Sequence, residues 1–217
     1  IALTQVIRPG CPVIAGSFLT TMNLKTGAPT FGTPEAHLSS LAFGQLIRRL
    51  GLPLRTGGHL TASKCADAQA MQESATSMMS GLMAGSNFVF HAAGWLEGGL
   101  TVGYEKFMLD LDHCGMMHRF SEGLVVDEES LALDTYTEAP PGHNHLGTSH
   151  TLRNFRSANH ESSLADVQPY ETWVEQGSKS AEQRANIQWK QALQDYSPPY
   201  IEPGIDEASR AFMDRRK

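Results

Sequence analysis

The chain is poor in cysteine and in positive charge. Each of these shortages excludes a class of protein. Three cysteines occur in 217 residues, Cys11, Cys65 and Cys114, and no two are spaced as C-x-x-C. An odd number of widely separated cysteines argues against a secreted fold built on disulfides, so the cytoplasm is the expected compartment. The formal net charge is −6. This argues against nucleic-acid binding, which depends on Lys and Arg side chains at the phosphates.

The sequence also lacks a membrane-spanning run and the common nucleotide-binding and hydrolase motifs. The most apolar window, residues 78–96, contains Ser80, Asn87 and His91 and three glycines, whereas a span needs about 20 predominantly apolar residues. There is no G-x4-G-K-[ST], no G-x-S-x-G, and no G-x-G-x-x-G after a strand-like segment. We therefore expect neither a membrane partner, nor a phosphate-binding loop, nor a serine nucleophile at an elbow.

What the first 125 residues do contain is a succession of three strand–loop–helix units. Predicted strands cover residues 12–18, 53–55 and 88–90, and predicted helices cover residues 33–50, 67–84 and 104–120. This alternation predicts an α/β fold with a parallel sheet. The apolar run at residues 88–90 is typical of a strand buried on both faces. Three units are too few for a closed barrel, which uses eight strands and about 250 residues.

Apolar side chains at helical spacing predict which helix faces are buried. In the first predicted helix these side chains are Leu38, Leu41, Ala42 and Leu46. In the third they are Phe107, Met108, Leu111 and Met116. The glycine- and threonine-rich segment before the first helix, residues 20–32, is expected to be a loop.

Beyond residue 125 the character of the chain changes. Residues 126–166 begin with an acidic stretch, show few regular signals and are expected to be a loop-rich connection. Residues 167–217 read as helices, with a capping box at Ser180 and Gln183 and a last helix from about Ile205. The expected organisation is therefore an α/β part over residues 1–125, a connection over 126–166 and a helical extension over 167–217.

Polar and aromatic side chains gather where the predicted strands end. Arg55 and His59 flank two glycines after the second strand, His91 follows the third, and Trp95 and Glu97 lie in the glycine-rich turn beyond it. Pockets of α/β proteins form at such strand ends, and an arginine there can hold a carboxylate through two hydrogen bonds. The alternative is structural: His91 is a hydrogen-bonded core residue, Glu97 is a carboxylate at a helix start, and Arg55 is a surface arginine in a turn.

Aromatic residues offer a second kind of recognition. A quaternary ammonium group is attracted to aromatic faces, and the candidates for such a box are Phe18, Trp95, Tyr104 and Trp173. The alternative for each of them is a place in the core. His143, His145 and His150 suggest zinc, but their spacing is not a specific zinc signature, and we expect them to hydrogen-bond within a folded loop without metal.

Four segments resemble the trimethylamine methyltransferase family: residues 16–36, 91–110, 142–156 and 170–185. They keep their order over nearly the whole chain. The resemblance implies a (β/α)8 TIM barrel, of which this chain, beginning at Ile1, would be the C-terminal part: the last βα units followed by a helical extension. Since a partial barrel leaves sheet edges unpaired, we expect a homo-oligomer or association with the missing part of the barrel.

The resemblance also implies an activity. Members of the family move a methyl group from an amine to the cobalt of a corrinoid carried by a separate protein, in methanogenesis and one-carbon metabolism. Members that act on trimethylamine contain pyrrolysine, and this sequence shows none. It therefore resembles the pyrrolysine-free type, which demethylates quaternary amines such as glycine betaine.

For such an enzyme the catalytic residues are unassigned, and the expected substrate-binding residues are His91, Trp95, Glu97, Arg55, His59, Phe18 and Tyr104. Two alternatives stay open. The first is a non-catalytic module that binds an amine or docks a corrinoid protein. The second, weaker one is a zinc-dependent TIM-barrel enzyme that uses His143, His145 and His150.

Overall fold

A three-stranded parallel sheet organises the first part of the chain. The computed structural model describes residues 1–16 and 18–216. The sheet has the order β1 (Ala15–Gly16), β4 (Leu54–Gly57), β5 (Phe88–Phe90), and both pairings are parallel. The predicted parallel sheet is thereby confirmed. The first strand is much shorter than residues 12–18, and Ser17 and Lys217 lie outside the described residues.

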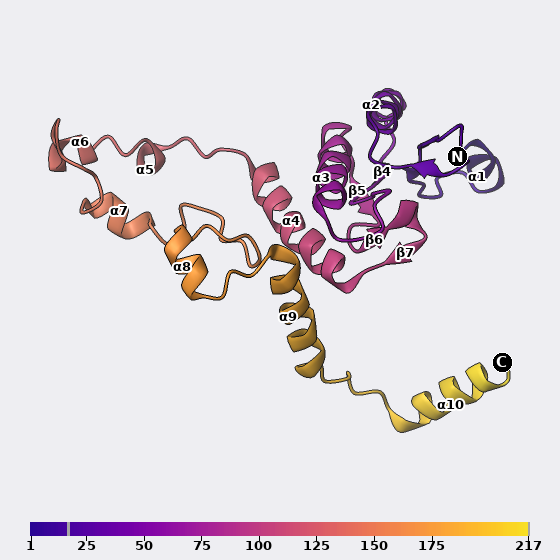
Figure 1. Cartoon of the computed structure of the whole chain (residues 1–217). Helices are drawn as coiled ribbons and strands as arrows, with labels where there is room; N and C mark the ends of the chain where they lie inside the picture. The colour runs from indigo at the N-terminus through magenta and orange to yellow at the C-terminus, as the bar shows by residue number, and fades with distance from the viewer. Residues whose placement is uncertain (17, 217) are drawn as a thin grey trace.

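Three long helices follow the strands, as the sequence predicts. They are α2 (Pro34–Arg49), α3 (Ala68–Met83) and α4 (Tyr104–Glu122), and a short helix α1 (Ala2–Ile7) precedes them. Local signals set their ends: Pro34 occupies the first turn of α2, and the Asp67 side chain accepts a hydrogen bond from the Ala70 amide at the start of α3. Figure 1 shows these helices and the strands gathered in one body.

The core between the sheet and α2 is small and closely packed. Ala15, Ile47, Leu54 and Ala84 form one buried apolar cluster. Gly44 lets α2 approach α3, because a Cβ at this position would lie 2.4 Å from the Ala84 carbonyl oxygen. A glycine in the middle of a helix costs stability, and here it permits a contact that no other residue would allow.

The predicted buried faces are partly wrong. Leu38 and Leu46 are exposed, and α2 instead buries Ala36, Gly44 and Ile47. On α4, Phe107 and Leu111 are exposed, whereas the buried residues are Lys106, Leu109 and Asp110. Periodicity located the helices but not their inner faces, because small residues and a buried ion pair occupy positions that a hydrophobic pattern passes over.

The sheet is also more open than predicted. Phe88 and Phe90 of β5 are 48% and 49% exposed, so the prediction of a strand buried on both faces is wrong for the described chain.

Two antiparallel hairpins flank the sheet: β2 (Thr21–Met22) with β3 (Pro29–Thr30), and β6 (Trp95–Leu96) with β7 (Thr101–Val102). A 3-10 turn, η1 (Glu97–Gly99), joins the second pair. The sequence predicted loops, not hairpins, in both of these segments.

Short helices follow α4 along an extended path. They are α5 (Glu128–Leu131), α6 (Thr135–Glu138), α7 (Ser149–Asn154) and α8 (Tyr170–Glu175). The chain then returns to pack α9 (Ala181–Gln194) against α4, and α10 (Pro203–Asp214) extends away from the body (Figure 1). The capping box at Ser180 and Gln183 is confirmed. Among the helices described, none has the length and apolar content to cross a membrane.

The contact between α4 and α9 joins the helical extension to the α/β part. Leu109, Leu164 and Ala185 form its buried apolar centre. The Glu105 carboxylate accepts hydrogen bonds from Asn186 Nδ2 at 2.6 Å and from Trp189 Nε1 at 2.8 Å. These two donors hold the pKa of Glu105 below its usual range.

Replacing Glu105 with alanine is expected to lower the free energy of unfolding by about 1–2 kcal/mol, because two hydrogen bonds to a charged group are lost. Urea unfolding followed by tryptophan fluorescence measures the loss, and the emission of Trp189 should shift to the red. Glu122→Ala, at the exposed end of the same helix, is the matched control. Equal effects of the two substitutions would contradict this assignment.

Candidate functional site

A pocket of about 290 Å3 lies at the carboxyl ends of the three parallel strands. Four of the predicted site residues, Phe18, Arg55, His91 and Trp95, line it. The remaining lining residues are Leu60, Gly98 and Gly99. Phe18 follows β1, Arg55 lies in β4, His91 follows β5 and Trp95 begins β6. The side chains thus come together because parallel strands end at the same edge of a sheet.

Three rings, those of Phe18, His91 and Trp95, stand together in the wall of the pocket. The His91 ring centroid lies 5.2 Å from that of Phe18 and 5.3 Å from that of Trp95, both with tilted or edge-on geometry. Phe31, buried behind Phe18 at 4.9 Å, comes from the segment after β3 and supports that ring. The unpredicted β2–β3 hairpin therefore contributes to the pocket by fixing one of its walls.

Arg55 supplies the positive charge of the pocket. Its Cζ atom lies 5.6 Å from the centroid of the Phe90 ring, which holds the guanidinium through a cation–π contact. Gly16 on the neighbouring strand makes room for it, since a Cβ there would lie 2.8 Å from Arg55 Nε. The strand pairing thus places a glycine beside the guanidinium that enters the pocket.

His91 combines an uncommon backbone conformation with a neutral imidazole ring. Its φ is +57°, in the left-handed region that a residue with a Cβ rarely adopts. Burial lowers its pKa, and the charge of Arg55 lowers it further, so the ring is neutral at pH 7. Within the described residues, His91 Nδ1 is buried without a hydrogen-bond partner. A neutral ring with an open nitrogen can accept or donate a hydrogen bond without repelling a cation.

Three predicted site residues lie elsewhere. The Glu97 side chain is exposed, and the residue acts through its backbone, with φ +51° and its amide donating to the Ser63 carbonyl at 2.7 Å. Tyr104 stacks on Trp189 with centroids 4.8 Å apart and so belongs to the α4–α9 contact. His59 is fully buried beneath the pocket loop, where it hydrogen-bonds to His113.

A buried ion pair on α4 also lies beneath the pocket loop. Lys106 Nζ and Asp110 Oδ2 form a hydrogen-bonded pair, and both side chains are fully buried. The Gly94 amide donates to the same carboxylate oxygen at 2.8 Å. Burial lowers the pKa of Lys106, and burial raises the pKa of Asp110 to about 6. The carboxylate thus stays charged at pH 7 because Lys106 and Gly94 compensate it.

The protonation of His59 makes stability depend on pH. Its pKa falls from 6.5 to about 4, chiefly because of burial; the hydrogen bond to the Ala92 carbonyl opposes this shift, and the nearby His113 and Lys106 add to it. Between these values the unfolded chain binds a proton that the folded protein excludes. The contribution is therefore complete above pH 6.5 and is lost as the pH falls towards 4.

We expect His59 to account for a loss of about 2 kcal/mol in the free energy of unfolding between pH 7.5 and pH 5. Urea unfolding of the wild type and of His59→Asn at both pH values measures it. Asparagine does not titrate, so the stability lost between pH 7.5 and pH 5 should be about 2 kcal/mol smaller in the variant than in the wild type. The same loss in both proteins would show that His59 is not held neutral.

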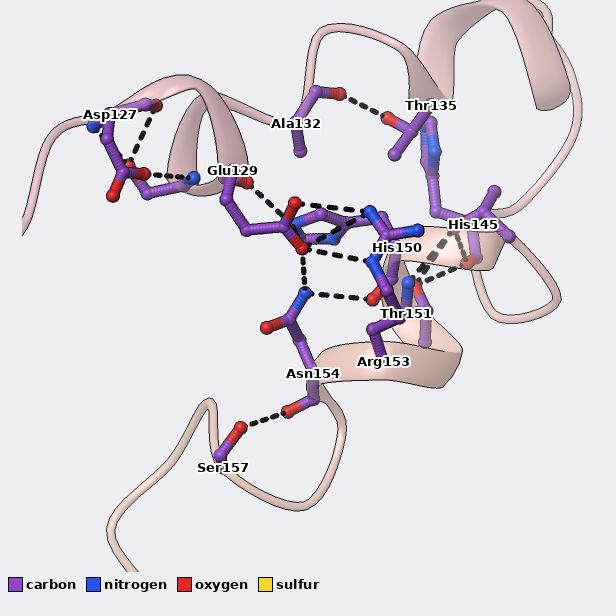
Figure 2. Close-up of polar contacts among 12 residues, drawn as sticks. Asp127, Glu129, Ala132, Thr135, His145, His150, Thr151, Arg153, Asn154 and Ser157 are labelled. Atoms are coloured by element: carbon purple, nitrogen blue, oxygen red, sulfur yellow. Dashed lines mark hydrogen bonds and ion pairs between the residues drawn. The ribbon is translucent and has the colours of Figure 1, made fainter.

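Of the three histidines proposed as an alternative zinc site, His150 has a hydrogen-bond partner for its ring (Figure 2). His150 Nε2 lies 2.8 Å from the Glu129 carbonyl oxygen, and the Glu129 carboxylate accepts hydrogen bonds from Arg153 and Asn154. His145 uses its carbonyl to accept from Thr148 and Thr151. In the described part of the chain, no group of three or more His, Cys, Asp or Glu side chains could hold a metal ion.

Sequence reasoning missed several contributors to the site. Phe90, Leu60, Gly98 and the α4 residues His113 and Asp110 were not singled out. One signal was available: Lys106 and Asp110 stand four residues apart, a spacing that favours an ion pair on one helix face. Nothing in the spacing showed that this face is buried.

Fold and site together define an α/β protein with a small aromatic and cationic pocket at the carboxyl ends of parallel strands, the usual place for small-molecule recognition. The sequence profile described as trimethylamine methyltransferase (MTTB) matches residues 1–217. The chain therefore belongs to the trimethylamine methyltransferase family.

Curated relatives show two kinds of amine substrate in their names. The chain is 38% identical over 216 residues to a glycine betaine methyltransferase of Desulfitobacterium hafniense (strain Y51), covering 100% of this chain and 45% of the relative. It is 29% identical over 214 residues to trimethylamine methyltransferase MttB of Desulfitobacterium hafniense (strain DSM 10664 / DCB-2) and 30% identical over 217 residues to MttB2 of Methanosarcina mazei. In both cases the match covers 99% of this chain and 43% of the relative. The chain thus spans less than half the length of these relatives.

Proposed function

We propose that the pocket binds a methylated amine that carries both a quaternary ammonium and a carboxylate, as glycine betaine does. The observation that carries this proposal is the combination of aromatic walls with one arginine. The ammonium group would lie against the rings of Trp95 and Phe18. The carboxylate would lie towards Arg55, whose guanidinium suits a two-pronged contact. The name of the Desulfitobacterium relative that acts on glycine betaine supports this choice.

The reaction we infer is transfer of a methyl group from this amine to the cobalt of a corrinoid. The bond between nitrogen and methyl breaks, and the departing tertiary amine is neutral, so no proton is needed. A pocket of about 290 Å3 holds a small amine but not a corrin macrocycle. The acceptor would therefore be presented from outside, on a separate protein. The chain's own residues would bind and orient the amine, and orientation of this kind is a large part of catalysis.

We also propose that the sheet is part of a (β/α)8 barrel, with the helical extension beginning after residue 166. The strand order and the parallel pairings support this, as does the exposure of Phe88 and Phe90, which further βα units would cover. The remaining units would come from another chain or a longer polypeptide. Sedimentation and melting of the 217 residues alone test this inference: a monodisperse monomer that melts cooperatively would count against it.

Calorimetry with glycine betaine and a methyl-transfer assay with cob(I)alamin test the proposed function. Saturable binding of glycine betaine, with methylcobalamin formed by the complete protein, is the expected result. Binding without transfer would instead favour a non-catalytic amine-binding module. Absence of binding to glycine betaine and to other quaternary amines would overturn the proposal.

A further inference from the structure

The loop that carries His91 into the pocket is held by two fully buried side chains. His59 Nδ1 hydrogen-bonds to the Ala92 carbonyl oxygen, and the Gly94 amide donates to Asp110. Gly58 permits this close approach, since a Cβ there would lie 2.9 Å from Ala92 Cα. The two anchors therefore fix the backbone on both sides of Ala93, between the pocket residues His91 and Trp95.

The hydrogen bonds of His59 define the protonation of both histidines. A carbonyl oxygen only accepts, so the Nδ1 atom of His59 carries the proton that is donated to Ala92. The ring is neutral, and its Nε2 atom must then accept. His113 Nδ1 lies 2.7 Å from it and is the donor. A chain of two neutral imidazoles thus runs from α4 to the pocket loop.

We propose that His59 is a positioning residue: held in its Nδ1-protonated form by His113, it fixes the Ala92 carbonyl and thereby the placement of the His91 and Trp95 rings. His59 does not line the pocket, so it would act only through this loop. The functional part of the inference rests on the proposed function, because it predicts an effect on amine binding. The structural part, the tautomer and the ring placement, does not.

The test compares His59→Leu with His59→Asn in the full chain. The asparagine Nδ2 atom lies close to the position of the histidine Nδ1 atom and keeps the donor to Ala92, whereas leucine removes it. Glycine betaine affinity by calorimetry should fall on the order of tenfold in His59→Leu, since the Ala92 carbonyl loses its imidazole donor and keeps only the weaker Cys114 thiol, 3.7 Å away. It should return to within about twofold of the wild type in His59→Asn. The matched control is His118→Leu, which replaces an exposed histidine of α4, the helix that carries His113.

Nitrogen-15 NMR provides a readout that does not depend on the amine. The wild type should show His59 protonated at Nδ1, and the ring signals of His91 and Trp95 should shift in His59→Leu and return in His59→Asn. If the wild type bound no amine, the proposed function would fail, while these spectra would still decide the inference. An Nε2-protonated His59, or unchanged His91 and Trp95 signals in His59→Leu, would overturn it. If the leucine variant does not fold, His113→Phe, which removes the donor to His59, takes its place.

Discussion

Replacing Trp95 with alanine is expected to weaken glycine betaine binding by about thirtyfold. Trp95 is the largest ring in the pocket wall and lies 5.3 Å from the His91 ring. A cation desolvated against an indole face gains about 2 kcal/mol or more, which corresponds to that factor. Calorimetric titration at constant ionic strength measures the dissociation constant. The effect should be much smaller for an uncharged isostere, because the attraction depends on the positive charge.

Two further variants separate ring chemistry from packing. Trp95→Phe keeps an aromatic face and should retain much of the affinity. Trp173→Ala removes a tryptophan from α8, beside Tyr170 and outside the pocket, and should leave binding unchanged. If Trp95→Ala bound glycine betaine as tightly as the wild type, the aromatic wall would not be the ammonium site.

Replacing Lys106 with methionine is expected to lower the free energy of unfolding by about 3–5 kcal/mol. Both partners of the Lys106–Asp110 pair are fully buried, so the variant leaves a carboxylate without its counter-charge. The pKa of Asp110, already raised by burial, should rise further. The variant should therefore lose stability as the pH rises through this pKa and regain part of it at lower pH. Urea unfolding over a range of pH measures both effects.

A double variant and a surface pair provide the controls. Lys106→Met combined with Asp110→Asn removes both charges and keeps an acceptor for the Gly94 amide, so most of the lost stability should return. Arg119 and Glu122 form a pair on the same helix that is about half exposed, and Arg119→Met should change stability little. Equal effects of Lys106→Met and Arg119→Met would show that burial of the first pair has no energetic consequence.

The parts of the fold that the sequence predicted correctly are those with local causes. Asp67 caps α3 and Ser180 caps α9, each through a hydrogen bond to a residue only three positions further along the chain. The parallel sheet followed from the alternation of elements. Phe18, Arg55, His91 and Trp95 meet in one pocket because each lies in or just beyond a strand of that sheet or its flanking hairpin.

The parts that the sequence could not predict depend on distant partners. Tyr104 faces Trp189, far along the chain, so its aromatic ring belongs to a helix contact instead of the pocket. The hairpin strands are only two residues long, which is too short for the alternation of apolar and polar residues that identifies a strand in a sequence. His59 gave no sign of burial, since the loop that covers it and the helix that supplies His113 come much later in the sequence. Whether the seven predicted residues bind substrate stays a prediction.

The extended path between α4 and α9 has an entropic consequence. Docking α9 on α4 closes a loop over residues 123–180, and closing a flexible chain of that length costs on the order of 4 kcal/mol. Glu129 and Asn154, joined by a hydrogen bond of 2.7 Å, shorten the part of this loop that is free to fluctuate. In Figure 1, α5 lies away from α9. The exposed contacts around Glu129 nevertheless favour the docking of α9, because they lower the conformational entropy that the chain loses when α9 docks.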